Sequence, residues 1–286
     1  MALKINYNFQ SDFTHANLLR TEHNLNKNLE RLATGHRINR AADDAAGLYI
    51  ADQLKTYAIS LDQGTRNAQD GISVAQIAQG SLSEVYNVLN DIKAKAIQAG
   101  NTTLDDNARG ALQNDINKLA ETIGKIFKDT EFNGQKLFDL ANDSAFTIHY
   151  GGRENQTLKV DRIAMSATAG ADSATKSTVK IAAKTYSLDV TKASNAEKTI
   201  ATVDSLVRAV DKQAAYFGSR QIELEKIISN NETQAINTRD AESRIRDIDF
   251  AKEMSEFTKN NILMQSGTAM LAQANQQSQL VLQLLR

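Results

Sequence analysis

The residue types best suited to chemistry gather in one stretch, RLATGHRINRAADDAAGLYIAD, at positions 31–52. Two adjacent aspartates, Asp43 and Asp44, could act as paired carboxylates in acid–base catalysis or contribute to a metal site. Adjacent aspartates in front of a helix-forming segment such as AAGLYIADQL more often cap that helix. A side-chain oxygen accepts the free N–H groups, and negative charge suits the positive end of the helix dipole.

We therefore interpret this stretch as a joint between helices. Two of its arginines are near enough in sequence to pair with Asp43 and Asp44. Two more arginines and an aspartate lie on a segment that we expect to return to the same place, where an arginine could meet Asp43 or the returning aspartate. The predicted joint residues are Arg37, Arg40, Asp43, Asp44, Arg244, Arg246 and Asp247.

The sequence gives little support for a thiolate, zinc or phosphate-binding site. The chain of 286 residues has no cysteine, and its four histidines form no HxxxH or HExxH pair, so neither a thiolate site nor a zinc site is predicted. The GGR triplet at 151–153 lacks the lysine and the helix start of a phosphate-binding loop. Basic residues (33) nearly balance acidic residues (34), which indicates no nucleic-acid or membrane surface. We predict no enzyme, no cofactor and no metal.

The N-terminal segment MALKINYNFQSDF has no apolar core, and the chain has no run of about eighteen apolar residues. Neither a cleaved signal peptide nor a transmembrane helix is predicted. Taken alone, this pattern indicates a cytoplasmic protein.

The elements that must position the joint are long helices. No proline occurs, although average usage is roughly 5%, and proline breaks helices. Steps of four and three residues from Ile50 to Ala96 meet only apolar residues or glycine, which is typical of a left-handed coiled coil. Similar spacing occurs after residue 196 and, over a shorter length, from Leu112 to Ile126. The predicted seam residues are Ile50, Leu54, Leu61, Leu82, Val85, Leu89, Ile200, Val203, Val210, Phe217 and Leu224.

Both ends of the chain carry further apolar stripes at heptad spacing. A stripe so close to a terminus seldom has a partner within a compact domain, so we expect these segments to fray or to dock on other molecules. The stripe residues are Leu18, Leu25, Leu29, Leu32, Phe250, Met254, Phe257, Met264, Leu271, Val281 and Leu285.

The centre of the chain has a β pattern. EFNGQKLF at 131–138 contains an Asn-Gly turn, which predicts a hairpin with a type I′ turn. FTIHYGGRENQTLKV predicts a second hairpin. We expect a polar loop or thin insert at 166–178 and one or two strands in VKIAAKTYSLDV. The predicted fold is mostly α: a long antiparallel coiled-coil helical bundle with a small β-hairpin region in the centre of the chain.

Two terminal blocks resemble bacterial flagellins. They are LATGHRINRAADDAAGLYIADQL and SRIRDIDFAKEMSEFTKNNILMQSGTAMLAQANQQSQLVLQLLR, and the resemblance covers roughly residues 1–140 and 195–286. Three positions depart from the family pattern in the joint: His36 replaces a leucine, and Arg40 and Ala42 replace a small polar residue and a lysine. Near the C-terminus, Ser278 stands where many members have proline.

The resemblance implies an extracellular filament subunit that serves as the propeller of a swimming bacterium. Its implied partners are copies of itself, the flagellar type III export machinery, a flagellin chaperone, and the cap and hook-associated proteins. The implied divisions are an inner-core helix and spoke (1–44), rod helices (45–128), a β-hairpin region with a short variable insert (129–190), a further rod helix (191–236), and a second spoke and inner-core helix (237–286).

The resemblance also points to two kinds of surface residue. The vertebrate innate-immune receptor reads an arginine and a leucine in many flagellins, but Asp91 and Lys95 stand there, and Asp115 replaces a glutamate, so weak recognition is expected. Some flagellins carry O-linked sugars on central serines and threonines. The candidates for such sugars are Ser166, Thr168, Ser173, Thr175, Ser177 and Thr178.

Two alternatives to a filament subunit are a hook–filament junction protein and a soluble coiled-coil adaptor. A junction protein would be made in few copies, and an adaptor would stay inside the cell with ordered ends. For a filament subunit we expect the rod to fold alone, while residues 1 to about 40 and 250–286 become ordered only when subunits assemble, as in coupled folding and binding.

Overall fold

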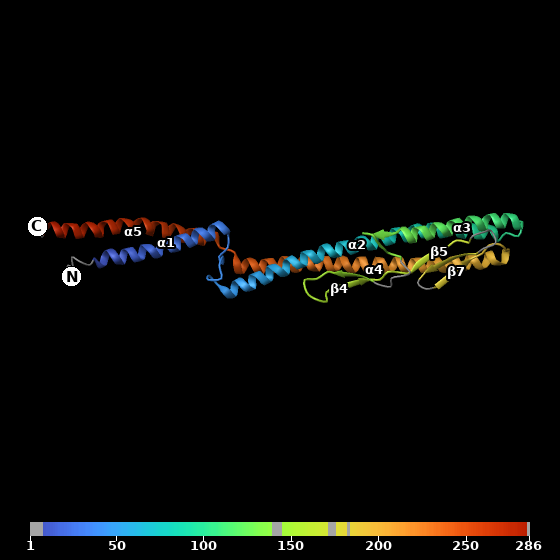
Figure 1. Ribbon diagram of the computed structural model, residues 1–286, viewed down its shortest axis with the longest axis horizontal. Helices are drawn as coiled ribbons and strands as arrows, with labels where there is room; N and C mark the ends of the chain where they lie inside the picture. The colour runs from blue at the N-terminus through green and yellow to red at the C-terminus, as the bar shows by residue number, and fades with distance from the viewer. Residues whose placement is uncertain (1–7, 139–144, 171–175, 182–183, 285–286) are drawn as a thin grey trace. The chain divides into compact units, whose positions relative to one another are not determined.

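A computed structural model describes residues 8–138, 145–170, 176–181 and 184–284, without the side chains beyond residue 276 (Figure 1). The chain divides into two compact units. The first comprises residues 1–57 and 236–286, and the second comprises residues 58–235. Helices α2 (Ala45–Ala99) and α4 (Ala193–Arg246) contribute residues to both units. The predicted mostly α fold with a small central β region is confirmed.

An antiparallel pair of helices forms most of the first unit. Helix α1 (Phe9–Thr34) lies alongside α5 (Phe250–Leu284) (Figure 1). Helix α1 begins where the Asn8 side chain accepts a hydrogen bond from the Ser11 N–H (3.1 Å). It ends at Gly35, whose φ of 73° suits glycine and whose N–H donates to the Arg31 carbonyl.

The core of the second unit follows the predicted heptads. Helix α2 packs with α3 (Asp106–Asp129), α4 and the strands around one hydrophobic cluster. The α2 positions of the heptad pattern are buried without interruption from Leu61 to Ala96. On α4, Val203, Val210, Phe217 and Leu224 are buried, and Ile200 is half-buried. Seams of this kind stabilise the unit by roughly 1.5–3 kcal/mol for each fully buried large side chain.

The seam differs from the prediction at the start of α2. Ile50 is 47% exposed and Leu54 is half-buried, whereas Ala51 and Ala58 are buried. Two successive steps of three residues, Ala58–Leu61–Gly64, shift the buried stripe around the helix, as a stammer does in a coiled coil. The assignment of Ile50 to the buried seam is therefore wrong.

The short strands complete the second unit. The Asn-Gly hairpin is confirmed: β1 (Glu131–Phe132) pairs with β2 (Gln135–Lys136), with positive φ at Asn133 (50°) and Gly134 (72°). The second hairpin is confirmed as β3 (Phe146–His149) with β4 (Thr157–Val160). A sheet of order β5-β6-β7 follows, formed by β5 (Met165–Thr168), β6 (Ser177–Ile181) and β7 (Lys184–Leu188).

The segment 166–178 is not simply a loop, because most of β5 and the first two residues of β6 fall within it. Strands β5 and β6 contact α3. A buried polar network, which the heptad pattern could not reveal, joins β6 and the segment after β7 to α3. The Gln113 amide on α3 donates to Asn117 (2.9 Å) and accepts from the Val190 N–H (2.8 Å). Ser177 donates to the same Asn117 oxygen (2.6 Å). These bonds satisfy polar groups that burial would otherwise leave costly.

Candidate assembly interface

The joint lies within the first unit, where two extended segments run side by side. His36 and Asp247 form an antiparallel bridge, flanked by hydrogen bonds from the Arg37 N–H to the Arg246 carbonyl (2.6 Å) and from the Ile248 N–H to the Gly35 carbonyl (3.1 Å). The side chains of His36 and Asp247 also meet, with Nδ1 3.0 Å from Oδ1. Backbone pairing therefore ties the segment after α1 to the segment before α5.

The two aspartates of the joint have separate roles. Asp44 caps α2, since its side chain accepts from the Gly47 N–H (2.9 Å). Asp43 accepts from the Asn39 and Arg40 N–H groups and forms an ion pair with Lys27 on α1 (2.6 Å). The hydrogen bond from Lys27 holds the pKa of Asp43 below its ordinary value of 3.8. The pair with Lys27 thus persists to a lower pH than an ordinary aspartate would allow.

The ionic partners of the predicted arginines differ from those expected. Arg40 pairs with Glu30 on α1 (2.9 Å), and the Arg37 guanidinium donates to the Ile245 carbonyl (2.8 Å). Arg244 pairs with Asp240 one turn earlier (2.8 Å), and Arg246 pairs with Asp52 on α2 (3.3 Å). Neither Asp43 nor Asp247 receives an arginine among the ion pairs of the described chain. Sequence spacing identified the segments that meet but not which charges pair.

A thin seam joins α1 to α5. Leu18, Leu25 and Leu32 on α1 are half-buried, as are Phe257, Met264 and Leu271 on α5. The buried side chains described in these two helices are Asn28, Asn260 and Ala274. Val281 and Leu285 lie outside the side chains that the structure describes. The seam therefore uses one row of each predicted stripe.

The rest of each stripe faces outward. Leu29, Phe250 and Met254 are not in the seam; their exposed fractions are 46%, 57% and 48%. Other large apolar side chains on the same two helices are exposed to a similar extent: Phe9, Phe13, Leu19, Ile262, Leu263 and Met270. Exposed apolar surface of this extent is typical of an interaction site.

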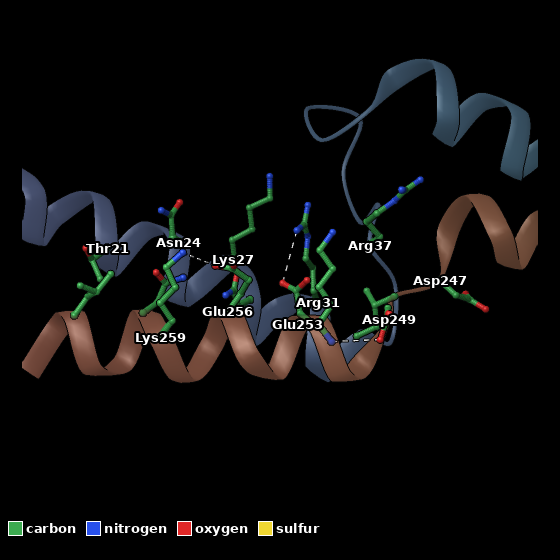
Figure 2. A pocket seen from close by; sticks show the side chains of 15 residues that line it. Thr21, Asn24, Lys27, Arg31, Arg37, Asp247, Asp249, Glu253, Glu256 and Lys259 are labelled. Carbon is green, nitrogen blue, oxygen red and sulfur yellow. Dashed lines mark hydrogen bonds and ion pairs between the residues drawn. The ribbon is translucent and has the colours of Figure 1, made fainter.

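A polar groove of about 750 Å³ lies beside the seam near the joint (Figure 2). Charged side chains of both signs from α1 and α5 surround it, and Arg31 contacts Glu253 across it with 3.7 Å between nitrogen and oxygen (Figure 2). None of the groove's charged residues on α1 or α5 was predicted, because a heptad count follows only the apolar positions. Among the described residues, no group of three or more His, Asp and Glu side chains is arranged to hold a metal.

The residues at the altered receptor positions lie on the second unit. Lys95 on α2 forms an ion pair with Asp115 on α3 (2.7 Å), and the hydrogen bond from Lys95 lowers the pKa of Asp115. Asp91 is exposed. The structure therefore brings two of the three positions together and ties α2 to α3 through them.

The predicted glycosylation residues differ in accessibility. Ser177 is fully buried and hydrogen-bonded to Asn117, so its assignment as a candidate is wrong. Thr168 is exposed, and Ser166 and Thr178 are half-buried. Ser173 and Thr175 lie outside the described residues.

Comparison with known proteins identifies the family. The model of the bacterial flagellin N-terminal helical region matches residues 5–143, and the model of the C-terminal helical region matches residues 200–285. The chain is 40% identical to a flagellin of Halalkalibacterium halodurans over 284 residues, covering 99% of each chain. It is 40% identical to a Bacillus subtilis flagellin over 304 residues, covering 99% of this chain and 100% of the other. It is also 34% identical to flagellin FlaB2 of Treponema pallidum over 291 residues, covering 99% of each.

A crystal structure of Bacillus cereus flagellin aligns with 58% of this chain and 88% of its own, at a TM-score of 0.40 and 20% identity. In the part of the chain that the structure describes, no helix is long and apolar enough to cross a membrane. The matches to both terminal helical regions, together with relatives that align along nearly the whole chain, show that this protein belongs to the bacterial flagellin family and is a structural subunit of the flagellar filament.

Proposed function

We propose that the α1–α5 pair forms the contacts between subunits in an extracellular filament that works mechanically as a propeller. The observation that carries this proposal is that α1 and α5 each have apolar side chains both in the seam between them and on their outward faces. Each helix turns one apolar row toward the other and leaves further large apolar side chains, such as Phe13 and Ile262, more than half exposed. Neighbouring subunits would bury those rows, at roughly 1.5–3 kcal/mol for each large side chain fully removed from water.

The free pair is then only marginally stable. Its buried side chains are two amides and one alanine within the described part, so little apolar burial offsets the entropy of ordering two long helices. Assembly supplies the missing burial and so stabilises a pair that is only weakly held together in the free subunit. We propose that different faces of the pair meet in neighbouring subunits, which makes the contact head-to-tail and lets it propagate helically.

Exchange of one outward-facing residue tests this role. We expect Ile262→Gln to raise the critical concentration for seeded polymerisation by about 10- to 100-fold, because it removes one large apolar side chain from each interface. Sedimentation of filaments grown from wild-type fragments measures this concentration. Circular dichroism of the free variant should match the wild type, since Ile262 is 58% exposed.

Gln273→Ala is the matched control for this exchange. Gln273 is exposed on the same helix, and its replacement removes no apolar surface. We expect its critical concentration to stay within about threefold of the wild type. Polymerisation of Ile262→Gln at the wild-type concentration would show that the outward face of α5 is not an interface.

The same exposed surface supports the proposed partners. A subunit with so much apolar surface on its terminal helices is prone to aggregate before assembly. A chaperone that covers α5, export through the flagellar type III channel, and docking under cap and hook-associated proteins would each protect that surface. We propose no enzymatic activity and no cofactor. The remaining glycosylation candidates are also a proposal, supported by the exposure of Thr168.

The altered receptor positions form a separate proposal. The receptor reads an uncharged leucine and an arginine in many flagellins, whereas Lys95 is held by Asp115 here and Asp91 presents a negative charge. We expect purified free subunits to activate receptor-bearing reporter cells weakly. Activation at the strength of a recognised flagellin would contradict this proposal.

A further inference from the structure

Two of the three most deeply buried side chains described in the pair of α1 and α5 are polar. Asn28 on α1 and Asn260 on α5 are 7% and 8% exposed. With the Asn28 amide oriented to suit its neighbours, its oxygen accepts from Asn260 Nδ2 (3.2 Å) and from the Phe257 N–H (3.2 Å). Its nitrogen donates to Glu253 Oε1 (3.1 Å) and to the Asn24 carbonyl (2.9 Å). Every hydrogen-bonding position of this amide is therefore used.

The apolar rows alone do not define how the two helices align. Leucines occur on α1 at 18, 25 and 32, and the facing row on α5 has Phe257, Met264 and Leu271. Both rows repeat every seven residues. A slip of one heptad, which is about 10 Å along the axis, would again place apolar residues opposite apolar residues.

The backbone bridge between His36 and Asp247 restrains a slip where the two helices meet the joint. Along the helices themselves, the second row of the seam distinguishes one alignment from the others. On α1 it reads Thr14, Thr21 and Asn28, and on α5 it reads Glu253, Asn260, Gly267 and Ala274. A slip in one direction moves Asn28 from Asn260 to Gly267. A slip in the other direction moves it to Glu253 and separates Glu253 from Arg31. Only the observed register places the two amides together. In this register Arg31 also contacts Glu253 (Figure 2).

We propose that Asn28 and Asn260 are the positioning pair that fixes the register of α1 against α5. A buried asparagine in a coiled-coil seam lowers stability but selects one alignment, because every other alignment leaves a buried amide without its partner. The outward apolar rows of the two helices must keep a fixed offset to match a neighbouring subunit, so a single register is a requirement for regular assembly. This inference goes beyond the proposed interface, since it concerns pairing within one subunit.

Engineered cysteines can read the register directly, because the natural chain has none. Ser11 and Asn275 touch in the observed register (3.1 Å), so Ser11→Cys with Asn275→Cys forms the in-register disulfide. Ser11→Cys with Thr268→Cys reports a slip of one heptad, and Leu18→Cys with Asn275→Cys reports a slip in the opposite direction. Mild oxidation of dilute free subunits, followed by non-reducing electrophoresis, gives the yield of each internal disulfide.

With Asn28 and Asn260 intact, we expect the in-register disulfide to form at least about tenfold faster than either slipped one. In the variant Asn28→Leu/Asn260→Leu, we expect that ratio to fall below about threefold, while the helical content stays equal or rises. The control Asn26→Leu/Gln273→Leu adds the same apolar groups at exposed positions of the same helices and should keep the tenfold ratio.

An unchanged ratio in Asn28→Leu/Asn260→Leu would overturn the proposal. So would the absence of any in-register disulfide with the amides intact, because the helices would then not pair as observed. Both measurements use free subunits and need no polymerisation. They therefore stand whether or not the α1–α5 pair proves to be the filament interface.

Discussion

We expect removal of residues 257–286 to abolish polymerisation and to leave the second unit folded. The truncation deletes most of α5, including the outward-facing Ile262 and Met270 and the row that meets α1. Residues 58–235 have their own hydrophobic core, so their helicity and their urea transition should match those of the full-length chain. Electron microscopy after seeding with wild-type fragments should show no growth.

The full-length variant Gln273→Ala, tested beside the truncation, shows whether handling alone affects growth. The truncated protein should also fail to slow the growth of seeds by wild-type subunits, since it lacks the surface with which a subunit docks. Regular filaments made of truncated chains would mean that contacts of the second unit are sufficient for assembly. Loss of the urea transition would instead mean that α5 supports the core of residues 58–235.

Periodicity predicted the parts of the fold that depend on local chemistry. The heptads from Leu61 to Ala96 and the Asn-Gly turn at Asn133 can each be recognised from residues that are close in sequence. The structure contains both. The shift of the seam near Ala58 could not be predicted in the same way. The sequence offers two rows there, one through Ile50, Leu54 and Tyr57 and one through Ala51, Leu54 and Ala58, and only the packing partner selects which row is buried.

The ionic contacts of the joint were not predictable for a different reason. An exposed ion pair contributes roughly 0.2–1 kcal/mol, so sequence alone gives Arg40 no strong preference between Asp43 and Glu30. The structure pairs Arg40 with Glu30 because a helical turn of α1 brings that carboxylate near, while Lys27 occupies Asp43. The sequence of a polar segment likewise does not show which of its residues are buried. For this reason Ser177 was predicted to be accessible.

The positions of the buried asparagines Asn28 and Asn260 could have been predicted from the heptad pattern. Asn28 falls three residues after Leu25 and four before Leu32, at a heptad position between two apolar ones. Asn260 occupies the equivalent position between Phe257 and Met264. A count of polar residues at seam positions, rather than of apolar ones, would have found both.

Two glycines of α2 should respond in opposite directions to the same exchange. Alanine favours a helix interior by roughly 0.5–1 kcal/mol over glycine. At Gly80 a Cβ would meet nothing within 4 Å, so we expect Gly80→Ala to raise the free energy of unfolding by about that amount. At Gly64 a Cβ would overlap the carbonyl oxygen of Tyr150. This oxygen belongs to the backbone, which cannot move aside as easily as the end of a flexible side chain.

That carbonyl and its neighbour anchor the β3–β4 hairpin to the helices. Tyr150 O accepts from the Asn231 amide on α4 (2.6 Å), and His149 O accepts from the Asn67 amide on α2 (2.8 Å). Gly64→Ala must push the hairpin away and lengthen both bonds, at roughly 1–3 kcal/mol for overpacking and about 1 kcal/mol for each weakened hydrogen bond. After the helix preference is subtracted, we expect the variant to be about 2–4.5 kcal/mol less stable than the wild type. Urea unfolding followed by circular dichroism measures both variants. Equal midpoints for Gly64→Ala and Gly80→Ala would mean that the hairpin does not lie against α2 at Gly64.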